Sequence, residues 1–145
     1  MTMNVAVMTR KEAYSDCRLA KLQKKVEFLQ GEIERITMLT ERKKRVLKAL
    51  RSSMESCGYD LDSVMGAKCR ERTLVDLRSI AWSIYKVETS YSCQQIAEDF
   101  GWDRTTIFCA IRRANELKKV DRNFADIYDT IFTAFKKAMT DNINN

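Results

Sequence analysis

Histidine is absent from the 145 residues of this chain. Its absence removes the Ser-His-Asp and Cys-His catalytic arrangements, the two-histidine zinc sites and the commonest acid–base residue. The five cysteines form no C-x-x-C pair, so they indicate neither a disulfide framework nor a zinc knuckle. We expect them to be reduced, as in a cytosol. These absences favour a protein that is not an enzyme and that holds no metal and no cofactor.

Proline is also absent, and only four glycines interrupt the chain, so helices can run without a break and strands lack turn signals. We therefore predict an all-α fold. The best apolar stretch is interrupted by Asp76 and Arg78, well short of the ~18 residues that a membrane-spanning helix needs. A cytoplasmic protein with no membrane partner is the expectation. The 26 basic and 20 acidic residues give a net charge of +6, which suits a polyanionic partner.

Apolar residues recur in steps of three and four near the N-terminus. This apolar seam consists of Leu19, Leu22, Val26, Leu29, Ile33 and Ile36. The spacing predicts a long coiled-coil helix over residues 19–44, preceded by a flexible tail over residues 1–18. Branched residues at the a positions Val26 and Ile33 favour a parallel homodimer through residues 19–40, and the uncharged e positions leave an antiparallel pairing open. The alternative is a helix that folds back onto its own domain.

Residues 45–140 are predicted to form a helical bundle, followed by a tail over residues 141–145. One helix is expected to begin with Thr73 as its N-cap, and a short helix to begin after Ser92 and end at Gly101. A further helix is expected to start at Asp103, and the last to run from about residue 121 to 139.

Three residues have the spacing of a helix-turn-helix motif: Ala97, Gly101 and Ile107. The motif needs a small residue where its helices cross, a residue that tolerates positive φ at the turn, and a branched apolar anchor in the second helix. The alternative is an ordinary pair of helices in a bundle.

In a helix-turn-helix, the first turn of the second helix enters the DNA major groove. The residues predicted to contact bases are Asp103, Arg104, Thr105 and Thr106. Arg112 and Arg113 lie further along and would reach backbone phosphates. The alternatives are that Asp103 only caps the helix and that Arg104 only lies in solvent.

The run Phe100-Gly-Trp-Asp-Arg-Thr-Thr-Ile-Phe-Cys-Ala-Ile-Arg-Arg113 resembles a family signature. It is similar to the motif Phe-Gly-(Gly)-Arg-Asp-His-Thr-Thr-Val, followed by Ala and a basic pair, in the C-terminal DNA-binding domain of the bacterial replication initiator DnaA. Upstream, the segment 70–81 resembles that family's basic loop and long helix, and the resemblance extends over roughly residues 45 to 138. Arg104 replaces the family's histidine, Trp102 replaces its usual arginine, and the turn is one residue shorter.

The resemblance implies binding to double-stranded DNA by two elements. The helix at Asp103 would enter the major groove, and Arg70 matches the arginine that enters the adjacent minor groove. Arg72, Arg78 and Lys86 match positions along the phosphate backbone. The initiator's ATPase has no counterpart here, because the sequence lacks a Gly-x-x-x-x-Gly-Lys-Ser/Thr phosphate loop, and we expect no nucleotide.

The sequence therefore predicts a non-enzymatic, sequence-specific DNA-binding protein that regulates replication or transcription in a bacterial or phage-infected cell. The alternative is a helical coiled-coil module that binds protein and has only non-specific affinity for DNA. A nuclease fragment would need clustered acids to hold a metal, but Asp121, Asp126 and Asp129 are more simply the polar face of the last helix.

Overall fold

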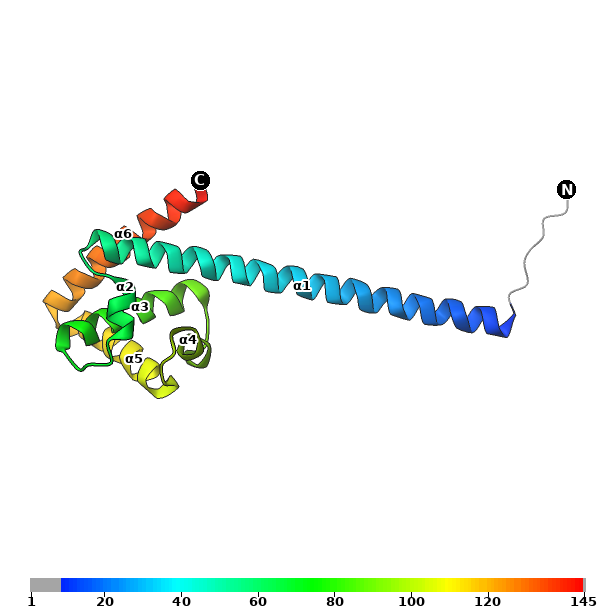
Figure 1. Ribbon diagram of the computed structural model, residues 1–145, viewed down its shortest axis with the longest axis horizontal. Coiled ribbons are helices and arrows are strands. Elements are labelled where there is room, and N and C mark those ends of the chain that lie inside the picture. The colour runs from blue at the N-terminus through cyan, green and yellow to red at the C-terminus, as the bar shows by residue number, and fades with distance from the viewer. Residues whose placement is uncertain (1–8, 145) are drawn as a thin grey trace. The chain divides into compact units, whose positions relative to one another are not determined.

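The computed structural model describes residues 9–144, and the side chains of residues 9–142. The helices are α1 (Arg10–Ser56), α2 (Leu61–Gly66), α3 (Arg72–Thr89), α4 (Cys93–Phe100), α5 (Arg104–Val120) and α6 (Arg122–Asn144), shown in Figure 1. No strand occurs among the described residues, so the prediction of an all-α fold with a long N-terminal helix is confirmed. No helix in this part of the chain is long and apolar enough to cross a membrane.

The chain divides into two compact units between Thr40 and Glu41. Helix α1 begins at Arg10, so the predicted tail is wrong over residues 10–18, while residues 1–8 lie outside the described part. The physical reason is a capping box. The backbone N–H of Thr9 donates to Glu12 Oε2 (2.9 Å), and the backbone N–H of Glu12 donates to Thr9 Oγ1 (3.2 Å).

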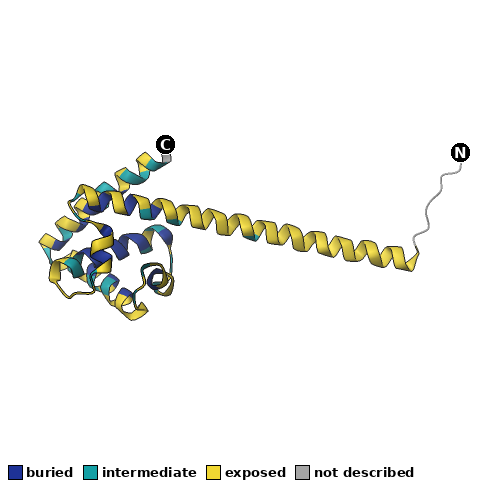
Figure 2. Ribbon diagram, viewed as in Figure 1, coloured by how far each residue is buried: buried dark blue, intermediate teal, exposed yellow. Residues whose placement is uncertain are grey.

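Within the first unit, the six residues of the apolar seam are each 49–62% exposed. Figure 2 shows this part of α1 as exposed along almost its whole length. A single helix has no interior in which to bury side chains, so the seam is a surface of the unit itself.

In the second unit, α3 is the central helix and contacts α2, α4, α5 and α6. Its residues from Leu77 to Tyr85 are all buried. The last turns of α1 add Val46 and Leu50 to the same core. One face of α6 closes the core with apolar residues at helical spacing, namely Phe124, Tyr128, Ile131 and Phe135.

Several predicted boundaries can be checked directly. Ser92 caps α4 in a capping box with Gln95, and Gly101 ends that helix with a left-handed φ of 69°, as predicted. The prediction of Thr73 as an N-cap is wrong, because α3 begins at Arg72 and its N-cap is Glu71. Helix α6 continues to Asn144, so the predicted tail from residue 141 is wrong for every described residue, since neither glycine nor proline interrupts this segment.

Candidate nucleic-acid interface

The turn between α4 and α5 consists of residues 101–103. Gly101 takes the left-handed conformation, and the backbone N–H of Trp102 donates to the carbonyl of Ala97 (2.9 Å), which closes the end of α4. Ala97 and Ile107 are both buried on either side of this turn. The two helices are therefore held together at the positions that the sequence pattern singled out.

The first turn of α5 is exposed to solvent. Asp103 is its N-cap, and one carboxylate oxygen, Oδ2, accepts a hydrogen bond from the backbone N–H of Thr105 (3.1 Å). Arg104, Thr105 and Thr106 are exposed, while Ile107 is fully buried and anchors the turn. The expected capping role of Asp103 is thus present, and its second oxygen, Oδ1, makes no hydrogen bond with the described residues.

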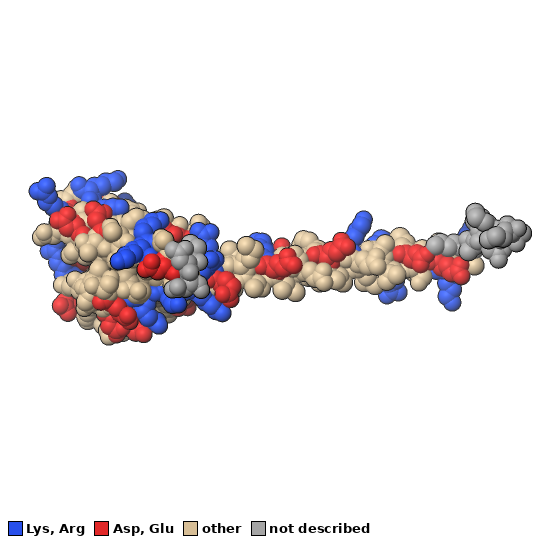
Figure 3. Space-filling view, turned by 90° about the horizontal axis from the view of Figure 1, so that it is seen from above, with Lys and Arg blue, Asp and Glu red and all other residues tan. Residues whose placement is uncertain are grey.

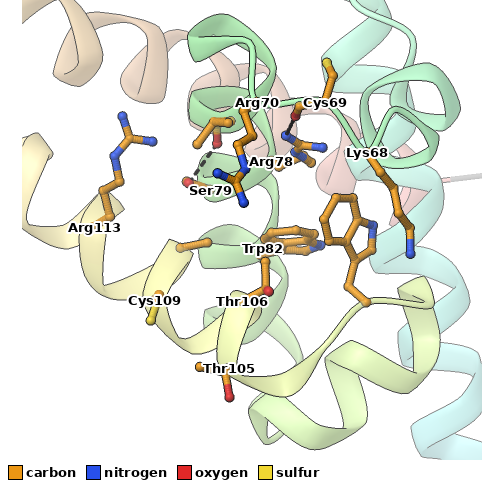
Figure 4. A pocket seen from close by; sticks show the side chains of 13 residues that line it. Lys68, Cys69, Arg70, Arg78, Ser79, Trp82, Thr105, Thr106, Cys109 and Arg113 are labelled. Carbon is orange, nitrogen blue, oxygen red and sulfur yellow. Dashed lines mark hydrogen bonds between the residues drawn. The ribbon is translucent and has the colours of Figure 1, made fainter.

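A hollow of about 500 Å³ lies between α5 and the loop that joins α2 to α3. In Figure 4, Lys68 and Arg70 come from the loop at the top of the view, and Thr105 and Thr106 come from α5 below. Its lining contains four basic residues and no acidic one; the basic residues are Lys68, Arg70, Arg78 and Arg113. An anion or an electronegative groove would therefore meet no like charge among the lining residues.

A second hollow, of about 410 Å³, borders the first turn of α5 and the start of α4. Its lining residues are Lys86, Ser92, Cys93, Gln94, Arg104, Thr105 and Phe108, again with basic but no acidic side chains. Thr105 belongs to both linings, so the exposed turn of α5 stands between two hollows of positive character.

The basic side chains that are predicted to contact DNA differ in their exposure and in whether they already form ion pairs. Arg70 and Arg104 are exposed and form no ion pair with the described residues. Arg72 lies 3.7 Å from Asp121, and Arg112 lies 3.3 Å from Glu116, with both arginine side chains at least 70% exposed. Exposed pairs of this kind contribute little to stability, so either guanidinium can exchange its partner for a phosphate.

Two other predicted phosphate contacts are more restrained. Arg113 pairs with Asp76 at 2.8 Å, with the arginine side chain 37% exposed and the aspartate side chain 22% exposed. The ammonium of Lys86 donates to the carbonyl of Tyr91 (3.2 Å) while the residue lines the second hollow. Both cations remain beside the hollows, but each already has an internal partner.

The prediction that Arg78 contacts DNA phosphate is wrong. The residue is only 4% exposed, and its guanidinium donates to the carbonyls of Ala67 and Cys69, the latter at 2.6 Å. Its carbon Cζ lies 4.7 Å from the centre of the Trp102 ring. Arg78 therefore fixes the backbone of the loop that carries Arg70, so its guanidinium is already engaged although the residue also lines the first hollow.

In the sequence, Trp102 is a departure from the motif that the chain resembles; in the structure, it joins the loop between α2 and α3 to the turn between α4 and α5. Its ring N–H donates to the carbonyl of Met65 (2.9 Å), and the ring packs edge-on against Trp82 at 5.3 Å. Lys68 Nζ lies 5.0 Å from the ring centre and donates to the carbonyl of Gly101 (3.4 Å). One sequence feature could have indicated this role. Trp102 is a large aromatic residue in a predicted turn, and such a residue is expected to pack against a second element.

A polar contact supports α4 from the opposite side. The hydroxyl of Tyr85 donates to Asp99 Oδ2 (2.8 Å), and Lys43 Nζ lies 2.6 Å from Asp99 Oδ1. Burial of the phenol, reinforced by the adjacent Asp99 carboxylate, raises the pKa of Tyr85 well above its usual value. Helix α4 is thus attached to α3 and to the segment of α1 that belongs to the second unit.

A metal site is the alternative that clustered acidic and cysteine side chains would indicate. No group of three or more Cys, Asp or Glu side chains is placed to hold a metal ion in the described part of the chain. Of the three acids weighed for a nuclease, Asp121 accepts a hydrogen bond from the backbone N–H of Phe124 (3.2 Å) at the start of α6. In comparisons with known proteins, no family model and no solved structure matches this chain.

Proposed function

We propose that this protein binds double-stranded DNA in a sequence-specific manner, without catalysis, as a regulator of replication or transcription. We propose further that residues 45–138 act like the DnaA C-terminal domain that they resemble. The observation that carries the proposal is the exposed first turn of α5, which stands between two hollows whose linings carry basic and no acidic side chains.

The major groove of B-DNA is about 12 Å wide and admits one α-helix. With α5 in the groove, Arg104 would donate to guanine, and Thr105 and Thr106 would offer a hydroxyl or a methyl group to a base edge. Asp103 engages its backbone cap through Oδ2, which leaves Oδ1 to accept from a cytosine amine. The base-contacting surface therefore has donors, acceptors and methyl groups together.

The loop between α2 and α3 supplies the second contact. Arg70 is exposed and unpaired with any described residue, so it can enter a minor groove, where narrow A·T-rich sequence concentrates negative potential. Arg72, Lys86, Arg112 and Arg113 would contact phosphates on either side. Arg78 is assigned instead to positioning the loop.

The apolar seam of α1 supports a homodimer through residues 19–40. Its six aliphatic side chains are about half exposed, and exposed aliphatic rows of this kind are buried by a partner helix in coiled coils. Two tethered DNA-binding units would bind a duplex with two half-sites more tightly than either unit binds one.

Selection of bound duplexes from a randomised DNA pool tests the proposal. An enriched motif is expected, and Thr105→Ala or Thr106→Ala should reduce discrimination against random duplex by about 1–3 kcal/mol. Thr133→Ala, an exposed threonine on α6, is the matched control and should change nothing. Weak, salt-dependent binding with no enriched motif would contradict the proposal and favour a protein-binding helical module.

A further inference from the structure

The apolar seam has charged neighbours on one side only. With Leu19, Val26 and Ile33 at the a positions, the g positions hold Arg18, Lys25 and Glu32. The e positions hold Gln23, Gln30 and Thr37, which carry no charge. In the structure, residues on both sides of the seam are exposed or partly exposed, and Figure 3 shows charges of both signs along this part of α1.

In a parallel pair, each g residue faces an e residue of the partner helix. Lys25 would then face the partner's Gln30, and Glu32 would face the partner's Thr37. Neither contact joins opposite charges. The parallel arrangement therefore leaves both Lys25 and Glu32 without an electrostatic partner across the interface.

In an antiparallel pair, g residues face g residues of the partner. When Val26 lies opposite the partner's Leu29, the ends of the seam also match, because Leu19 then lies opposite the partner's Ile36. Every seam residue is paired in this register. The same register puts Lys25 opposite the partner's Glu32, and the two-fold symmetry repeats the contact.

We infer that the apolar seam binds a second copy of this chain in antiparallel orientation, selected by two Lys25–Glu32 contacts between the subunits. The inference rests on the homodimer in the proposed function and is independent of DNA binding. Glu32 now lies 2.8 Å from Arg35 on its own helix, but that pair is exposed, so its carboxylate can also contact a partner's lysine.

Charge reversal in the full-length protein tests the orientation. Lys25→Glu alone sets acid against acid twice in the antiparallel dimer, and Glu32→Lys alone sets base against base twice. Each single variant should raise the dimer dissociation constant by about tenfold in low salt, since both contacts change from attractive to repulsive. The double variant restores both contacts and should recover the wild-type dissociation constant.

An equimolar mixture of the two single variants gives the sharpest result. An antiparallel heterodimer regains two acid–base contacts, so sedimentation equilibrium should show dimers in the mixture at concentrations where each variant alone is dissociated. Lys24→Glu and Glu34→Lys make the same charge changes at positions off the seam and its flanks. They should leave the dissociation constant unchanged, alone or mixed.

The outcomes distinguish the homodimer from its antiparallel orientation. A wild-type dimer whose Lys25→Glu and Glu32→Lys variants show no recovery on mixing overturns the antiparallel orientation and leaves the homodimer standing. A wild-type protein that sediments as a monomer at tens of micromolar overturns the homodimer and the orientation together, while DNA selection with the same sample still tests the DNA-binding proposal.

Discussion

Replacing Arg78 with methionine separates a structural arginine from a DNA-contacting one. Methionine keeps much of the length and apolar character of the side chain but removes the guanidinium. The change would leave the carbonyls of Ala67 and Cys69 without their present donor and would remove the cation from the Trp102 ring. We expect the loss to appear as a lower free energy of unfolding.

The magnitude follows from the contacts. A hydrogen bond from a charged group contributes about 1.5–3 kcal/mol net, and two such bonds are lost. Two effects reduce the sum. Cys69 is exposed, so water can replace the donor at its carbonyl, and removing a buried guanidinium also removes its desolvation penalty. We therefore expect the free energy of unfolding to fall by about 2–3 kcal/mol.

Urea denaturation followed by circular dichroism measures this change. With a slope of about 1–3 kcal/mol per molar urea, the midpoint should fall by roughly 0.7–3 M at fixed protein concentration. Arg72→Met is the matched control, because Arg72 is 77% exposed on its side chain, and its midpoint should hardly move. Instead, Arg72→Met should reduce the salt dependence of DNA binding by about one phosphate contact.

The reasoning would be refuted by the reverse pattern. If Arg78→Met left the urea midpoint unchanged and reduced the salt dependence of DNA binding by about one contact, Arg78 would be a phosphate ligand after all. The carbonyls of the loop would then have to be satisfied by water rather than by this side chain.

Three further changes test separate parts of the molecule. Arg70→Ala should weaken binding most at sites with a flanking A·T run, measured by fluorescence anisotropy on duplexes that differ only in that flank; a uniform loss would make Arg70 a phosphate contact. Val26→Lys combined with Ile33→Lys places like charges in the apolar seam, so sedimentation should show monomers whose affinity for a single half-site is little changed. Because the pKa of Tyr85 is raised on folding, its neutral phenol stabilises the folded state below about pH 10, and this contribution is lost as the pH rises above that value. Tyr85→Phe should cost about 1.5–3 kcal/mol at neutral pH through the lost bond to Asp99, and should lessen the fall in stability above pH 10; an equal fall in both proteins would contradict this.

The elements that sequence reasoning predicted well are those set by local chemistry. Ser92 with Gln95 forms a capping box, and Gly101 can take a left-handed φ that other residues adopt only with strain, so the limits of α4 follow from neighbouring residues alone. The start of α1 at Arg10 is also determined by neighbouring residues. The Thr9 and Glu12 box lies in the sequence, but it begins ten residues before the apolar seam, and the predicted helix started at the seam instead.

The assignment of Arg78 failed for a different reason. A basic residue on a helix that borders a basic loop has the same sequence pattern whether it faces solvent or a backbone carbonyl. Its direction is decided by the carbonyls of Ala67 and Cys69 and by the Trp102 ring, which lies 24 positions further along the chain. A pattern with helical period places Arg78 on α3 but contains no information about a loop folded against that helix.

Arg78 and Trp102 together explain how two distant segments could act on one duplex. An arginine in the minor groove and a helix in the major groove can bind one duplex together only if the distance between them matches the distance between adjacent grooves. The loop must therefore be held at a fixed position relative to α5. Arg78 holds the loop carbonyls, Trp102 holds the end of α2 through Met65, and Lys68 returns from the loop to Gly101 at the turn. These contacts link the loop to the turn: the Arg78 and Trp102 hydrogen bonds are part-buried, and the Lys68 hydrogen bond lies at the surface. Trp102, which stands where the motif it resembles has arginine, is therefore part of what would keep Arg70 and Thr106 on one hollow.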